Sequence, residues 1–162
     1  MKIKVVRQNE FELPLATPQN IVLWNENMRS CLSGDIEVYL DSITHCSMDV
    51  PLIGFYIDLK RAVSSVLLGG RNASVPADDE TLLFLYSTEE GCVATFTPRS
   101  NSSSEHEEIL LINDVRKLFR ALEADLRVEL LPYFEQIRSA YDQCPVGTLF
   151  EMIQLLEFEE GI

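Results

Sequence analysis

The chain has 162 residues, of which 46% are hydrophobic and 24% are charged, proportions that are ordinary for one globular domain. Its charge balance is not ordinary, because 26 acidic residues against 13 basic ones leave a formal net charge of −13. Phosphate backbones and anionic lipid surfaces repel such a chain, so we expect neither nucleic acid nor a membrane as its partner.

The N-terminal segment and the cysteines indicate a soluble, cytoplasmic protein. The apolar run after the basic start MKIK stops at Val6, which is too short for a secretory signal. A second apolar stretch, residues 50 to 70, is interrupted by Asp58, Lys60 and Arg61, which a membrane span tolerates poorly. The four cysteines are far apart and form no CxxC motif, so we expect free thiols and no metal or other cofactor.

The first forty residues predict strands around one helix. Residues 2 to 7 alternate apolar and polar side chains, which is typical of a half-buried strand. Residues 11 to 15 alternate too, but Pro14 restricts them to a sheet edge. Apolar residues at helical spacing then predict a helix over residues 18 to 32, ended by Gly34.

The next segment predicts a strand followed by a buried helix. Residues 35 to 44 alternate clearly, and we extend this strand to Cys46. Asp49 is then the expected N-cap of a helix over residues 50 to 68, which Gly69 and Gly70 end. The first half of this helix is apolar almost all round, so we expect it to lie across a sheet and to be covered on more than one side.

The second half of the chain predicts a hairpin, one more strand and a long helix. Residues 71 to 80 have the composition of a loop, whereas 81 to 87 and 92 to 97 flank a short connection with Gly91 and predict a hairpin. A strand over residues 107 to 112 leads to Asn113, the expected N-cap of a long amphipathic helix. Pro132 must kink or split this helix.

A last short helix is expected over residues 148 to 158. No repeat or long linker divides the chain, so residues 1–162 are interpreted as a single globular domain. The fold class is α+β: an antiparallel sheet of about five strands, with helices packed mainly on one face and a long C-terminal helix.

The stretch SITHCSMD, residues 42 to 49, places a thiol, an imidazole and a carboxylate close together in sequence. Successive side chains of a strand point to opposite faces, so Cys46 is expected in the core and His45 on the polar face. A Cys–His nucleophilic pair needs hydrogen-bond contact, which this geometry denies. His106 is expected in a solvated loop, without metal-ligand spacing to other residues. We therefore assign no catalytic residue and no metal ligand.

The acidity is concentrated in one segment. Between Asn72 and Asp114 nine carboxylates face a single cation, Arg99. Most of them map to loops at the ends of strands, where they could form one acidic rim that docks a basic partner. The alternative is that these loops only keep the protein soluble. The expected partner-binding residues are Asp78, Asp79, Glu80, Glu89, Glu90, Glu105, Glu107 and Glu108.

The element order resembles a widespread kind of small bacterial protein. The segments that carry the resemblance are PLIGFYIDLKRAV, TLLFLYSTEEGCVATF, EEILLIN and DVRKLFRALEADLRVELL, within residues 35 to 131. In size, acidity and element order the chain resembles immunity proteins of contact-dependent inhibition and related polymorphic-toxin systems. The resemblance implies a cytoplasmic, non-catalytic protein that binds and neutralises a cognate, basic toxin domain.

Two other classes stay open. A type III secretion chaperone is similarly small, acidic and α+β, and it works as a stable dimer on an exported effector. The apolar face of the helix after Asn113 is better explained by packing on its own sheet, so we expect a monomer rather than a dimer. A small enzyme or metal-binding protein is the third class, with His45, His106 and scattered carboxylates as its candidates.

Overall fold

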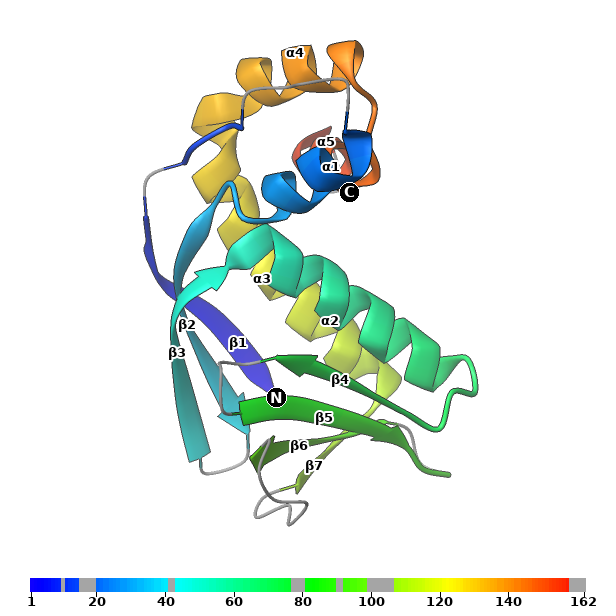
Figure 1. Ribbon diagram of the computed structural model, residues 1–162. Helices are drawn as coiled ribbons and strands as arrows, with labels where there is room; N and C mark the ends of the chain where they lie inside the picture. The colour runs from blue at the N-terminus through cyan, green and yellow to red at the C-terminus, as the bar shows by residue number, and fades with distance from the viewer. Residues whose placement is uncertain are drawn as a thin grey trace.

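The computed structural model describes residues 1–9, 11–14, 20–40, 43–76, 81–89, 92–98 and 107–157 (Figure 1). Its strands are β1 Lys2–Gln8, β2 Ser33–Leu40, β3 Ile43–Pro51, β4 Asn72–Pro76, β5 Thr81–Ser87, β6 Cys92–Pro98 and β7 Glu107–Leu110. Its helices are α1 Ile21–Arg29, α2 Leu52–Leu67, α3 Ile112–Leu130, α4 Phe134–Gln143 and α5 Gly147–Glu157, with a 3-10 turn, η1, at Leu131–Tyr133.

The strands form two antiparallel sheets, in the orders β1-β2-β3 and β4-β5-β6-β7. The α+β class is therefore confirmed, but the prediction of one sheet with about five strands is wrong. The prediction failed because α2 carries the chain from the first sheet to the second. Helix α2 contacts strands of both sheets (Figure 1). Helix α3 packs beside α2 and contacts β1 of the first sheet and β7 of the second.

The first sheet corrects the interpretation of residues 35 to 49. The expected strand ends at Leu40, and β3 pairs back along β2 with Leu40 opposite Ile43 and Glu37 opposite Cys46. Most of SITHCSMD is thus a strand of its own. Cys46 is exposed instead of buried, because the hairpin places it opposite Glu37 on the outer face of the sheet.

Asp49 is not the N-cap of α2. The cap residue is Pro51, which makes no side-chain hydrogen bond. Asp49 instead lies in the left-handed region with φ 52°, and its carboxylate accepts hydrogen bonds from Asn9 Nδ2 at 2.8 Å and Ser33 Oγ at 2.9 Å. Its backbone N–H donates to Asp35 Oδ1 at 2.9 Å. These bonds join the three strands at one end of the sheet.

Helix α2 is buried as the sequence predicts. Ten of its sixteen residues are buried, because it packs between the two sheets and the neighbouring helices. The expected double-glycine stop is confirmed. Gly69 has φ 101°, which a side chain rarely adopts, and the Gly70 N–H donates to Ser65 O at 2.8 Å. A Cβ at Gly70 would lie 2.6 Å from that same oxygen, so only glycine fits.

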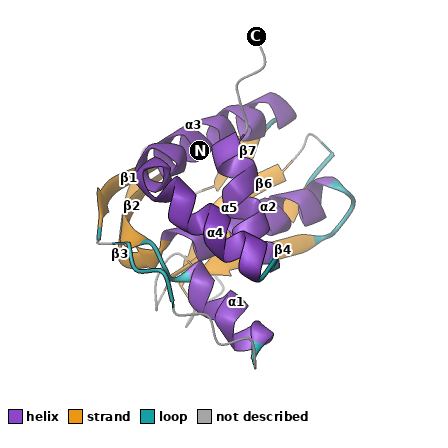
Figure 2. Ribbon diagram, turned by 90° about the horizontal axis from the view of Figure 1, so that it is seen from above, coloured by secondary structure: helices purple, strands orange, loops and turns teal. Residues whose placement is uncertain are grey.

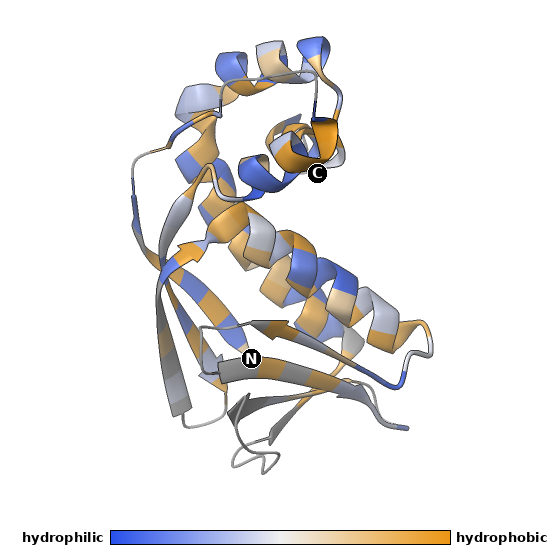
Figure 3. Cartoon of the chain, in the orientation of Figure 1, coloured by the Kyte–Doolittle hydropathy of each residue, from blue (hydrophilic) through white to orange (hydrophobic). Residues whose placement is uncertain are grey.

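The second sheet contains the predicted hairpin and one unexpected strand. β5 and β6 pair as expected, and β7 follows beside β6 but stops at Leu110, two residues early. Residues 72–76 were expected to be loop and instead form β4 along β5, with Val75 buried. The alternation in β1 and β2 appears as bands of hydrophobic and hydrophilic colour in Figure 3.

The C-terminal helical region is split at Pro132, as predicted, because η1 separates α3 from α4. Asn113 does not cap α3, whose cap residue is Leu111. Helix α1 is shorter than expected: Asn20 caps its start and it ends at Arg29. Figure 2 looks down on α4 and α5, and α5 contacts both α1 and α4.

The expected edge strand over residues 11 to 15 is not a strand in its described part, residues 11–14. The backbone of this segment still makes a hydrogen bond, because the Glu12 N–H donates to Cys31 O at 2.9 Å. Phe11 is buried and stacks on Tyr133 with ring centroids 4.3 Å apart. Within the described ranges, no helix combines the length and apolar character needed to cross a bilayer.

Candidate functional site

The structure describes three of the eight acidic residues expected to bind a partner. Glu89 is exposed just after β5. Glu107 and Glu108 belong to β7, opposite Thr95 and Ala94, although their side chains are not among those described. The other five residues lie outside the described part of the chain: Asp78, Asp79, Glu80, Glu90 and Glu105.

The order of the second sheet separates the acidic segments into two groups. Pro76 at the end of β4 pairs near the start of β5, where Thr81 in turn pairs with Pro98 at the end of β6. Segment 77–80 joins β4 to β5 at this end of the sheet, and segment 99–106 follows β6 there; we call these two segments the acidic end. Glu107 and Glu108 pair with Thr95 and Ala94, which are opposite Phe84 and Leu85 of β5, so the backbone of these two glutamates lies in the middle of the sheet. Glu89 follows Ser87 at the opposite end, about 20 Å away along a seven-residue strand.

The outer face of the first sheet carries a small polar cluster that the sequence interpretation missed. Glu37 is its centre: the Tyr39 hydroxyl donates to Glu37 Oε2, and the Cys46 thiol lies 4.0 Å from Glu37 Oε1. The Lys2 ammonium lies over the Tyr39 ring, 5.9 Å from its centroid. The bond to the Glu37 carboxylate raises the pKa of Tyr39, so this hydroxyl stays protonated as a donor at neutral pH.

Cys46 lies on the exposed face of the first sheet, in register with Glu37, and not in the core where the sequence pattern placed it. His45 pairs in register with the buried Val38, and its side chain is outside what the structure describes. His106 lies outside the described residues altogether. Among the residues that the structure does describe, no group of three or more His, Cys, Asp or Glu side chains could hold a metal ion.

The buried thiols differ from Cys46 in their surroundings. Burial raises the pKa of Cys31 from an ordinary 9.0 to about 12, and burial also raises the pKa of Cys92. A thiol with a raised pKa forms little of the reactive thiolate at neutral pH. Of these three cysteines, only Cys46 is therefore accessible to reagents from solvent.

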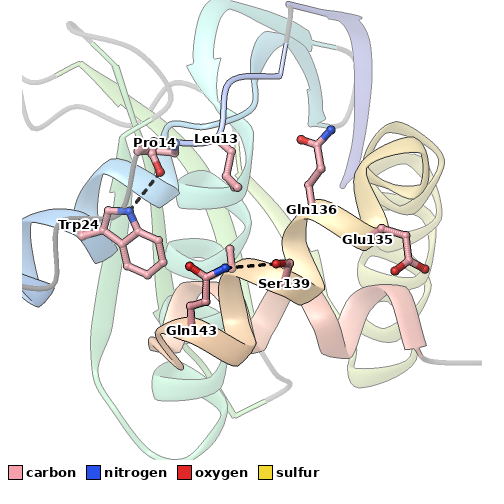
Figure 4. Close-up of a pocket in the computed structure, with 8 residues that line it drawn as sticks. Leu13, Pro14, Trp24, Glu135, Gln136, Ser139 and Gln143 are labelled. Carbon is pink, nitrogen blue, oxygen red and sulfur yellow. Dashed lines mark hydrogen bonds between the residues drawn. The ribbon is translucent and has the colours of Figure 1, made fainter.

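A groove with a volume of about 460 Å³ lies between residues 11–14, α1 and α4. Figure 4 shows its lining, with Trp24 beside Pro14 and the α4 side chains along the other side. Trp24 Nε1 donates to Pro14 O at 3.2 Å, and Gln143 Nε2 donates to Ser139 Oγ at 3.2 Å. Glu135 is its only charged lining residue within the described part of the chain. Residues 15–19, which follow Pro14, are not described, so the groove is not assigned a ligand.

No protein-family model matches the chain, and neither the curated proteins nor the solved structures contain a significant match.

Proposed function

We propose that the chain is a non-catalytic immunity protein, which binds a basic bacterial toxin domain and neutralises it through the acidic end of the second sheet. One observation carries the site. The antiparallel order brings the strand ends that adjoin segments 77–80 and 99–106 to the same end of the sheet. The two segments contain four carboxylates and one arginine, and Glu107 and Glu108 follow the second segment in β7.

The net charge of the whole chain also favours a basic partner. A net charge of −13 attracts a basic domain over long distances, and a local concentration of carboxylates orients the encounter. Glu89 follows β5 at its other end, so the proposal predicts unequal roles for residues of the same chemistry. This inequality makes the proposed site testable.

The experiment is a calorimetric titration of the chain with the toxin domain encoded by the adjacent upstream gene. The test variant is Asp78→Lys/Asp79→Lys in segment 77–80, at the acidic end. Its matched control, Glu89→Lys/Glu90→Lys, makes the same charge change at the opposite end of the sheet. We expect the test variant to raise the dissociation constant about thirtyfold, which is a loss of about 2 kcal/mol of binding free energy. The control should raise it less than about threefold.

Circular dichroism of both variants checks that the second sheet remains folded. Equal losses in the two variants would show that net charge, and not the acidic end, determines binding. Absence of any complex with the wild-type chain would remove the immunity function itself. An inhibition assay on the toxin must follow the same order of affinities, since the proposed function is neutralisation and not binding alone.

A further inference from the structure

We draw no further inference here: the strongest candidate, the largely apolar groove between residues 11–14, α1 and α4, adjoins residues 15–19, which lie outside the described part of the chain, so nothing in the structure shows what covers it.

Discussion

Tyr56 connects α2 to α3 through one partly buried hydrogen bond, and its removal tests how these two helices are held together. Its side chain is buried, and its hydroxyl donates to Glu123 Oε1 at 2.7 Å. The ring packs edge-on against Phe119, with centroids 6.3 Å apart. The change Tyr56→Phe removes only the hydroxyl and keeps this packing.

The loss can be estimated from the charge and exposure of the acceptor. A hydrogen bond to a charged group contributes about 1.5 to 3 kcal/mol. Glu123 is half-buried, so water can replace part of the bond, and the lower value of about 1.5 kcal/mol applies. For a chain of this length the melting temperature should fall by about 3 to 6 °C.

The assay is urea unfolding followed by circular dichroism, with Tyr39→Phe as the matched control. Tyr39 also donates to a carboxylate, that of Glu37, but on the solvent-facing side of the first sheet. Its removal should cost less than about 0.5 kcal/mol, because water replaces the lost partner. Equal losses in both variants, or no loss in Tyr56→Phe, would refute the argument that burial determines the strength of this bond.

Three further predictions concern the cysteines and glycines. A thiol reagent should label Cys46 first and Cys31 and Cys92 only on unfolding; slow labelling of Cys46 would contradict the β2–β3 hairpin. Because the folded-state pKa of Cys31 is raised to about 12, its contribution to stability is complete below pH 9 and is lost as the pH rises towards 12. The free energy of unfolding of Cys31→Ala should therefore fall less steeply with pH in that window than that of the wild type, by about 1.4 kcal/mol per pH unit. An unchanged slope would contradict the burial of this thiol. Gly70→Ala should destabilise the chain by about 1 to 3 kcal/mol in thermal unfolding, because its Cβ would meet Ser65 O, whereas Gly147→Ala enters open space and should be nearly neutral. Equal effects of the two glycine changes would contradict this explanation.

Elements with a clear period could be predicted from the sequence. The alternation of residues 2–7, the double glycine after α2 and the effect of Pro132 all depend on neighbours close in the chain, and the structure confirms them. Helix α2 was recognised because its first half is apolar almost all round.

The wrong predictions concern segments whose conformation depends on the strand with which they pair. The sequence pattern predicts β2 and β3 as one strand, because only residues 41 and 42 separate them and the alternation continues to Cys46. β4 was missed because its composition is that of a loop, and its strand conformation depends on pairing with β5. Both errors concern contacts that a local pattern does not contain.

The candidate site was predictable in composition but not in arrangement. The sequence locates the carboxylates, whereas only the strand order separates Glu89 from the acidic end.

Hydrogen–deuterium exchange of the chain, with and without the basic toxin domain, tests the central claim most directly. Binding at the acidic end predicts slower exchange in peptides that cover residues 74–82 and 96–108, with little change in the peptide that covers residues 86–92. Protection of residues 86–92 alone, or of neither end of the second sheet, would contradict the proposed site.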